Sequence, residues 1–591
     1  MAQDTYRIGG GGGFMVDSIT AVPQLLAAGV DAIIMDFLAE GAMGLFGRMR
    51  AADPAMGYSA DFITRYIGPH LDEIARRGTK IVSNAGGVNP LALAARLREE
   101  IAKRGLNLKV AAVAGDCLMD RVGEFAGMKG IEGDDVLPDS GVTSINAYLG
   151  GFPIAAALAG GADIVVTGRV VDSALALGLL INRFGWKEDQ WDLIAAGTLV
   201  GHLIECGAQA TGGTYTDWDQ VEGWDRIGFP IAECRADGTC VITKGEGTGG
   251  LVTVGTVSEQ LLYETSDPQA YIVPDVVCDF TQVTMTQEGK DRVLVQGMKG
   301  HPRTPTLKVC ATFDQGWRVT SYQPVIGPRA IAKAKKQAEA HFERGATLLR
   351  ERNMPGFITK EAILIGSGES VGARAPDPDS VMEILLKISA DFETQQSAGL
   401  FAYELHAQMC GMAPGTSIVP FAGLSPVLHM VAFLIPRESV TALVDLDGTP
   451  QACPDRGPAG VPLSITSRPP VPELPAPGGG VVPLEKIAFT RSGEKGETVN
   501  VGVIARDPAY LPAIRAALTP QALADWFAHL FRDPAQAQIQ IYDLPGLNAI
   551  NVVLGGALPG GINASSRLDS AAKSVGQQLL PFQLPCAALG M

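Results

Sequence analysis

Apolar and polar residues form two different patterns along the first third of the chain. Short apolar runs are typical of buried strands and occur at residues 5–8, 31–35, 80–82, 108–114 and 163–166. Longer stretches with apolar residues three or four positions apart predict helices at residues 16–28, 91–104, 153–158 and 171–184. Repeated strand–helix–strand units predict an α/β fold with a large, mostly parallel sheet and helices on its faces, and ligands bind at the carboxyl ends of such strands.

The pattern changes in the middle of the chain. Strand-like runs dominate from about residue 271 to residue 326, and helical periodicity returns at residues 330–351 and 380–412. We therefore predict one large α/β body over residues 1–449. It has two lobes, roughly 1–215 and 216–449, and the second lobe contains the β-rich stretch.

A proline-dense run separates this body from the end of the chain. Residues 468–480 read RPPVPELPAPGGG, which can neither join a helix nor fill a central strand, so residues 450–483 are predicted to form an exposed linker. Residues 484–591 are long enough for a small α+β domain. Its predicted strands lie at 485–490, 500–504, 538–542 and 549–554, and its helices at 511–531 and 567–580.

Composition and charge restrict the classes of partner. Of 591 residues, 46% are hydrophobic and 19% are charged, which is typical of a globular protein and not of a disordered one. The net charge of −16 repels polyanions, so nucleic acid and anionic membranes are not expected partners. A local basic pocket for a small phosphorylated ligand remains compatible with this charge.

The cysteines and the start of the chain indicate the cellular setting. Nine cysteines are scattered without a C-x-x-C pair, and the first residues lack a basic segment followed by an apolar core. The most apolar stretch, residues 148–166, is interrupted by glycines, a proline and Asp163. We therefore expect a reducing, cytoplasmic location with no membrane span and no disulfide framework.

Glycine is unusually abundant, with 71 residues in 591. The run at residues 9–13 lies between a predicted strand and a predicted helix, where the amides of Gly10, Gly11 and Gly12 are candidates for binding phosphate. A tight turn without a ligand explains the run equally well. Residues 245–250 have the G-x-G-x-x-G spacing, but residues 251–255 predict a strand where the dinucleotide fingerprint requires a helix.

One predicted helix has a polar stripe on an otherwise apolar surface. His202, Glu205, Cys206 and Gln209 fall at i, i+3, i+4 and i+7 and so share one face. The stripe is either solvated or buried against a ligand, since a buried polar stripe needs partners. If it is functional, Glu205 is a candidate base, Cys206 a candidate acid or nucleophile, and His202 an orienting group or metal ligand.

The helix is followed by small polar residues. The amides of Thr211, Gly212 and Gly213 are candidates for receiving an oxyanion, and Gln209 for binding substrate. A metal requirement stays open, because His202 and Glu205 supply at most two ligands for zinc.

Polar residues also follow three predicted strands at one edge of the sheet. Arg169 and Asp172 come after the strand at 163–166, Asn84 after that at 80–82, and Asp116 after that at 108–114. Asp172 can simply cap the next helix, and capping does not exclude function. Three polar strand ends at one edge make Arg169 and Asp172 candidate catalytic residues and Asn84 a candidate for substrate binding.

The C-terminal domain carries cations in glycine-rich loops. Arg491 and Lys495 lie in a charged loop between two strands, and Arg567 and Lys573 follow a second glycine-rich loop. Arg491 and Lys495 are candidates for binding an anionic substrate. Docking of the domain onto the body would use the same groups, so that alternative stays open.

Together these motifs resemble those of the acyclic terpene utilisation (AtuA) family. The resemblance rests on residues 9–13, TGRVVDS at 167–173, ECGAQATGG at 205–213, RSGEKG at 491–496 and SRLD at 566–569. Where relatives tend to carry Asp in the tail motif, this chain has Glu494 and Glu497, which keeps the charge. The resemblance implies a large body followed by a small ferredoxin-like domain.

The resemblance also implies a role in the breakdown of branched acyl-CoA compounds. Its implied reaction is a lyase or hydratase step on a 3-hydroxy-3-alkylglutaryl-CoA type of intermediate, with a coenzyme A thioester as substrate and no cofactor assigned. We expect a homo-oligomer. Three hypotheses follow: an acyl-CoA lyase, a hydratase or isomerase of an unsaturated acyl-CoA, and a non-catalytic acyl-CoA-binding or scaffold subunit.

Overall fold

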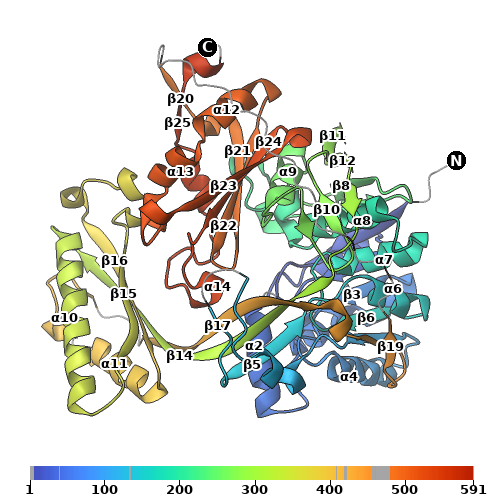
Figure 1. Ribbon diagram of the computed structural model, residues 1–591, viewed down its shortest axis with the longest axis horizontal. Helices are drawn as coiled ribbons and strands as arrows, with labels where there is room; N and C mark the ends of the chain where they lie inside the picture. Colours follow the sequence, from blue (N-terminus) through green and yellow to red (C-terminus); the bar gives the residue numbers. More distant parts are fainter. Residues whose placement is uncertain are drawn as a thin grey trace.

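The computed structural model describes residues 5–38, 40–131, 135–407, 409–417, 422–454, 457, 460 and 480–589, and every structural statement below concerns these residues. A large α/β body occupies the right-hand side of the molecule in Figure 1, with a second lobe at the lower left and the C-terminal domain at the top. The proline-dense run predicted as a linker lies largely outside the described residues. The described ends of that segment form short strands, β19 and β20, described below.

An 11-stranded sheet runs through the body in the order β11-β12-β8-β7-β1-β2-β3-β6-β4-β18-β19. Its centre is parallel and consists of β1 (Tyr6–Gly10), β2 (Ala32–Met35), β3 (Lys80–Ser83), β6 (Ile164–Thr167) and β4 (Val110–Ala114). Antiparallel strands extend both sides: β7 (Pro230–Cys234), β8 (Cys240–Lys244), β12 (Arg292–Gln296), β11 (Thr284–Gly289), β18 (Ala442–Asp445) and β19 (Gln451–Cys453). The sheet is therefore mixed, and the predicted parallel pairing is confined to its five central strands.

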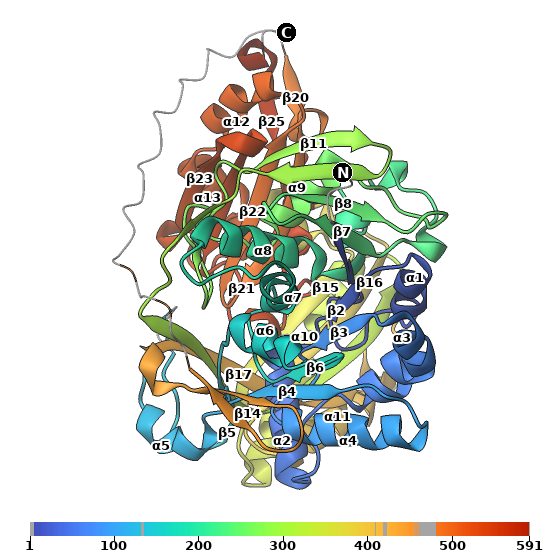
Figure 2. The same cartoon turned by 90° about the vertical axis from the view of Figure 1, so that its right-hand side faces the viewer.

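Two layers of helices cover the central strands because successive side chains on a strand point to opposite faces. Ile33 and Met35 pack with α1 (Ala21–Ala27), α3 (Leu71–Arg77) and α4 (Pro90–Lys103). Ala32 and Ile34 belong to the opposite core, with α6 (Phe152–Ala159), α7 (Ala174–Phe184) and α8 (Trp191–Ile204). Figure 2 shows α7 and α8 on one side of the strands and α1 and α3 on the other. Both faces are buried, which explains the almost unbroken apolar runs of these strands.

The second lobe is built on one long strand. β14 (Thr306–Ile326) starts in the body, where it pairs with β5 (Val142–Ala147), and continues into a sheet of order β15-β16-β14-β17. β15 spans Phe357–Ile365 and β17 spans Gly423–Pro436, and α10 (Ala330–Glu351) and α11 (Gln395–Ala407) pack on this sheet.

The helix predicted over residues 380–412 is wrong in its first part. Residues Glu383–Phe392 form β16, a central strand of that sheet. Ile384, Leu386 and Ile388 are fully buried and alternate along the strand, so the apolar period is two and the helix begins only at Gln395.

The C-terminal domain is an antiparallel sheet with helices packed against it. The strand order is β21 (Ala488–Lys495), β22 (Thr498–Ala505), β24 (Ala549–Gly555) and β23 (Gln538–Leu544). The helices include α12 (Leu511–Ala517), α13 (Pro520–Trp526), α14 (Gly561–Ala564) and α15 (Val575–Leu579). β20 (Val481–Pro483) pairs with β25 (Gln583–Pro585). The predicted terminal helix at 567–580 is shortened to α15, because Asp569 accepts hydrogen bonds from the amides of Lys573 and Ser574 and holds a turn there. The predicted fold class, an α/β body followed by a small α+β domain, is confirmed.

Buried hydrogen bonds fix the C-terminal domain to α9 (Val254–Leu262) and the residues around it. Asn500 donates to the Leu262 carbonyl at 2.6 Å, and Asn551 donates to the Thr265 carbonyl at 2.6 Å. Arg506 pairs with both carboxylate oxygens of Asp217 at 2.5 and 2.6 Å. The domain is thus held by directional contacts that set its orientation on the body.

Within the described residues, no helix combines the length and apolar character needed to cross a bilayer.

The second lobe contains a histidine that folding keeps neutral. His341 is 1% exposed on α10 and its Nε2 lies 3.1 Å from Gln323 Oε1. Burial lowers the pKa of His341 from 6.5 to about 4. Below about pH 6.5, His341 therefore binds a proton in the unfolded chain but not in the folded lobe. The free energy of unfolding consequently falls as the pH drops from 6.5 towards 4.

We predict that lowering the pH from 7 to 5 costs the wild-type protein about 2 kcal/mol of unfolding free energy through this one group. Urea unfolding of wild type and of His341→Gln at both pH values measures it. The variant should lose less stability than wild type over this range. Equal pH dependence in wild type and His341→Gln would contradict the assignment.

Candidate functional site

Polar side chains from four neighbouring strands meet at the carboxyl edge of the parallel sheet. Asp36 follows β2, Asn84 follows β3, Asp116 follows β4, and Arg169 follows β6. Asn84 donates to Asp36 Oδ1 at 2.6 Å and accepts the Phe37 amide at 2.6 Å. The side chain of Asn84 is fully buried and both its ends are occupied, so in this structure it supports the edge of the sheet.

Arg169 is at the centre of this edge and is only 2% exposed. Its backbone amide donates to Asp116 Oδ2 at 2.8 Å, and its guanidinium donates to the Leu38 carbonyl. The same guanidinium pairs with Asp172 at 3.2 Å and lies 4.3 Å from the centre of the Tyr148 ring. Burial raises the pKa of Asp116 to about 6, while the Arg169 amide and other donors oppose that rise. Burial likewise raises the pKa of Asp36 to about 6, against the attraction of Arg169.

A cavity of about 350 Å³ opens beside this group. Arg169, Asp172, Tyr148 and Lys308 line it from the body, and Glu264 and Lys495 line its opposite side. Lys308 lies 5.1 Å from the centre of the Tyr148 ring, so two cations, Arg169 and Lys308, lie close to this ring. Three cations therefore surround a cavity in a protein whose net charge is −16.

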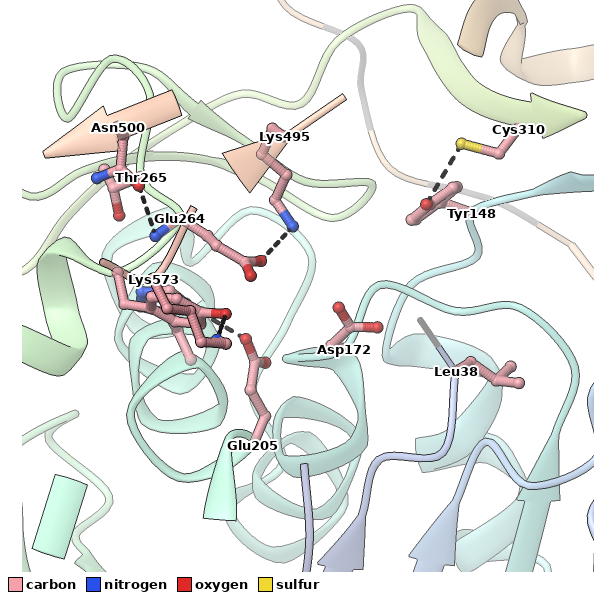
Figure 3. Close-up of polar contacts among 12 residues, drawn as sticks. Leu38, Tyr148, Asp172, Glu205, Glu264, Thr265, Cys310, Lys495, Asn500 and Lys573 are labelled. Carbon is pink, nitrogen blue, oxygen red and sulfur yellow. Dashed lines mark hydrogen bonds and ion pairs between the residues drawn. The ribbon is translucent and has the colours of Figure 1, made fainter. Parts of the chain in front are cut away.

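The C-terminal domain supplies one wall of the cavity. Lys495 ends β21 and pairs with Glu264 at 2.7 Å (Figure 3). Burial alone would raise the pKa of Glu264, but Lys495 outweighs it, so the pKa is lowered and the pair stays ionised. Asn500 of β22 accepts the Glu264 amide at 3.0 Å, which fixes the backbone that presents this carboxylate.

His202 and Glu205 share a proton behind the cavity. His202 is 2% exposed, its Nε2 is 3.0 Å from the Leu261 carbonyl and its Nδ1 is 3.3 Å from Glu205 Oε1. Because a carbonyl only accepts, Nε2 carries a hydrogen, and the contact between Nδ1 and the carboxyl group needs one more proton.

The surroundings of this pair shift both groups. Burial opposes the charged form of His202, but the bond to Glu205 outweighs it and the pKa of His202 is raised. Burial also raises the pKa of Glu205, with Asp172 adding to the rise. Figure 3 shows the carboxyl groups of Asp172, Glu205 and Glu264 directed towards one region. Glu205 Oε2 is buried without a hydrogen-bond partner among the described residues.

The helical stripe predicted from the sequence is present only in part. α8 ends at Ile204, Glu205 caps it, and Gly207–Thr211 continue as a 3₁₀ turn, so Gln209 leaves the stripe. Cys206 and Gln209 do not line the cavity. Burial raises the pKa of the Cys206 thiol well above its ordinary value, so the sulfur stays protonated near neutral pH.

Two of the three backbone amides predicted to bind an anion are used within the chain. The amides of Gly212 and Gly213 donate to the Gln209 and Ala208 carbonyls, and the Thr211 hydroxyl donates to the Ala208 carbonyl at 2.9 Å. None of these three residues lines the cavity.

The glycine run at residues 9–13 packs against the end of α8. A Cβ on Gly10 would lie 2.0 Å from the Ile204 carbonyl oxygen, and one on Gly13 would lie 2.8 Å from Cys206 backbone atoms. Gly11 donates to the Ile34 carbonyl, while the Gly12 carbonyl accepts the Asp36 amide. Gly10, Gly11 and Gly12 are all buried, and this close approach accounts for glycine here.

The prediction of a strand at residues 251–255 is wrong. Thr253 caps α9, so the glycines at 245, 247 and 250 do stand between a strand, β8, and a helix. The end of this glycine-rich turn packs closely against other backbone segments. A Cβ on Gly249 would lie 2.0 Å from the Gly223 carbonyl oxygen, and a Cβ on Gly250 would lie 2.5 Å from the Thr211 carbonyl oxygen.

Arg491 is separate from the cavity and faces α9. It is 6% exposed, donates to the Thr214 carbonyl at 3.1 Å and lies 4.6 Å from the centre of the Tyr263 ring. Of the two tail cations predicted to bind substrate, the structure thus brings Lys495 to the cavity and Arg491 to the domain contact.

The cavity residues that the sequence did not predict include Tyr148, Glu264 and Lys308. Tyr148 directly follows β5 within an apolar stretch, and Lys308 lies near the start of β14. Glu264 has a left-handed φ of 56° directly after α9, which no spacing rule reveals. Among the described residues there is no cluster of three or more His, Cys, Asp or Glu side chains placed to hold a metal ion.

Comparison with models of known families identifies the family of the chain. The model of the acyclic terpene utilisation family protein AtuA matches residues 6–446, and that of the AtuA ferredoxin-like domain matches residues 482–585. The chain belongs to the AtuA family. The predicted ferredoxin-like character of the C-terminal domain agrees with the second match. No curated protein and no solved structure matches this AtuA family member significantly.

We predict that Gly10→Ala destabilises the protein by about 2 kcal/mol or more, since the added Cβ forces β1 away from α8. Gly123→Ala is the matched control, because Gly123 lies exposed in a short helix with open space around its Cα. Denaturant midpoints of the three proteins measure the difference. A Gly10→Ala protein with wild-type stability but reduced ligand binding would instead support a phosphate-binding role.

Proposed function

We propose that this AtuA family member is an acyl-CoA lyase that cleaves a 3-hydroxy-3-alkylglutaryl-CoA type of thioester in the cavity beside Arg169. The observation that carries the proposal is the placement of the Asp172 carboxylate in a cavity that also contains three cations, Arg169, Lys308 and Lys495. Such a thioester brings a carboxylate and a polarised carbonyl, and cations stabilise both.

The reaction is a retro-aldol type of cleavage. A base takes the proton of the tertiary alcohol, the alcohol carbon becomes a ketone carbonyl, and the bond to the neighbouring methylene carbon breaks. The bonding electrons pass into the adjacent carbonyl as an enolate, which an acid then protonates on carbon. No oxidant or reductant is consumed, and the small product is acetyl-CoA or acetate, depending on which arm of the glutaryl unit leaves.

We assign the base to Asp172 and the acid to the proton shared by His202 and Glu205. Asp172 lines the cavity, whereas Glu205 lies behind it and shares its proton with His202. This reverses the role expected for Glu205 from the sequence alone. Arg169 stabilises the enolate oxygen, and Cys206 has no part in this scheme.

We predict that Asp172→Asn lowers kcat by about a hundredfold or more, since the amide keeps the shape but cannot accept the alcohol proton. Asp189→Asn changes an exposed aspartate and serves as the matched control. Purified protein is incubated with 3-hydroxy-3-alkylglutaryl-CoA thioesters, and the products are followed by mass spectrometry. Absence of both acetyl-CoA and acetate with every thioester would refute the lyase proposal.

The same assay in deuterated water separates the lyase from a hydratase or isomerase. Those enzymes would use the same acid and base on an unsaturated acyl-CoA without breaking a carbon–carbon bond. Deuterium entering the thioester with no fragment released would therefore favour the hydratase or isomerase.

A point substitution in the C-terminal domain tests the scaffold alternative. Deleting residues 484–591 cannot do so, because the deletion removes the cavity wall that carries Lys495. We predict that Lys495→Met lowers kcat/KM about tenfold or more through loss of a charge-assisted contact. Lys486→Met changes an exposed lysine of the same domain and should leave kcat/KM unchanged. Wild-type turnover by Lys495→Met would support a structural role for the domain.

A further inference from the structure

A second and larger cavity, of about 630 Å³, lies between the second lobe and the C-terminal domain. β15 and the 3₁₀ segment Glu369–Arg374 form one side, and the segment from Arg567 to Gln578 forms much of the other. It shares no lining residue with the cavity beside Asp172. Its volume falls within the roughly 300–1,000 Å³ typical of small-molecule sites.

The walls of this second cavity are mostly apolar. They include Ile363 and Val371 from the second lobe and Leu530, Leu558 and Leu568 from the C-terminal domain. Leu568 is 53% exposed although it faces a cavity, so an apolar ligand would remove a large side chain from water.

One charged group of this cavity lacks a partner. The Arg374 guanidinium lies 4.1 Å from the centre of the Trp526 ring, and its Nη2 is buried without a hydrogen-bond acceptor among the described residues. Partial burial of the side chain lowers the pKa of Arg374. An anion that reaches Nη2 would supply the missing acceptor of this partly buried cation through a charge-assisted hydrogen bond.

The other charged groups of the cavity are already engaged. Arg567 donates to the carbonyls of Ala557 and Leu530. Asp569 accepts the Ser574 amide at 2.7 Å, and Glu361 accepts the Ser566 hydroxyl. Among the described residues that line this cavity, Arg374 is the one with a buried side-chain nitrogen or oxygen that has no hydrogen-bond partner.

We propose that this second cavity binds an amphipathic monocarboxylate, a molecule with one carboxylate on a long apolar chain, with the carboxylate on Arg374 and the chain along Leu530, Leu558 and Leu568. A multiply charged ligand fits less well, because Glu361, Glu369 and Asp569 also line the space. The site is separate from the proposed active site and does not depend on the lyase chemistry.

One loop lies between the second cavity and the wall of the cavity beside Asp172. Ala572 and Ser574 line the second cavity, and Lys573 between them donates to the Tyr263 hydroxyl next to Glu264. The same few residues thus border the second cavity and the wall that carries Glu264.

Titration calorimetry with decanoate as the probe tests the proposal. We predict one saturable site in wild type, with affinity rising about three- to fourfold for each added methylene from hexanoate to decanoate. Decanol, which has the chain without the charge, should bind at least about tenfold more weakly than decanoate. Equal binding of decanol and decanoate, or no saturable binding, would overturn the assignment.

Substitutions locate the bound decanoate. Arg374→Met should weaken it about tenfold or more, Arg374→Lys should restore part of the affinity, and Arg352→Met on the exposed surface of the same lobe is the matched control. Asp172→Asn and Lys495→Met should leave decanoate binding unchanged. Loss of binding in Lys495→Met with retention in Arg374→Met would place the carboxylate in the cavity beside Asp172 and overturn the proposal, without bearing on the lyase activity.

Discussion

The organisation of the site depends on the burial of one guanidinium. Arg169 is almost completely removed from water, and an uncompensated charge in that position would cost several kcal/mol. Its compensation comes from the Leu38 carbonyl, the Asp172 carboxylate and the Tyr148 ring, which reach it from the ends of β2 and β6 and from the loop after β5. Satisfying Arg169 therefore positions Asp172 and gives the cavity its rigid side.

The opposite side of the cavity is built by different means. Glu264 and Lys495 compensate each other across the contact between body and C-terminal domain, and Asn500 fixes the Glu264 backbone. This pair remains ionised in spite of burial, so the cavity keeps charges of both signs facing a small space. Charged groups held in this way need no rearrangement when charge develops in a substrate, which is the main advantage of a preorganised site.

Much of the body was predictable because its central strands and helices have a clear period in the sequence. The strand ends that carry Asn84, Asp116, Arg169 and Asp172 follow directly from that pattern. The pattern failed at β16, where an alternating apolar set lies next to a true helix, and at residues 251–255, where Thr253 caps a helix that β-branched residues disguise. Glu264 and Lys308 were out of reach, because only the three-dimensional contact of distant segments brings them to Asp172.

The pairing of Glu264 with Lys495 also bears on how such a protein can change over time. The two family models treat the body and the ferredoxin-like domain as separate units, yet this ion pair makes the cavity a joint property of both. Replacing either charge leaves a partly buried opposite charge on the other unit. An exchange of either part for a foreign counterpart would therefore have to keep the matching charge on the other part.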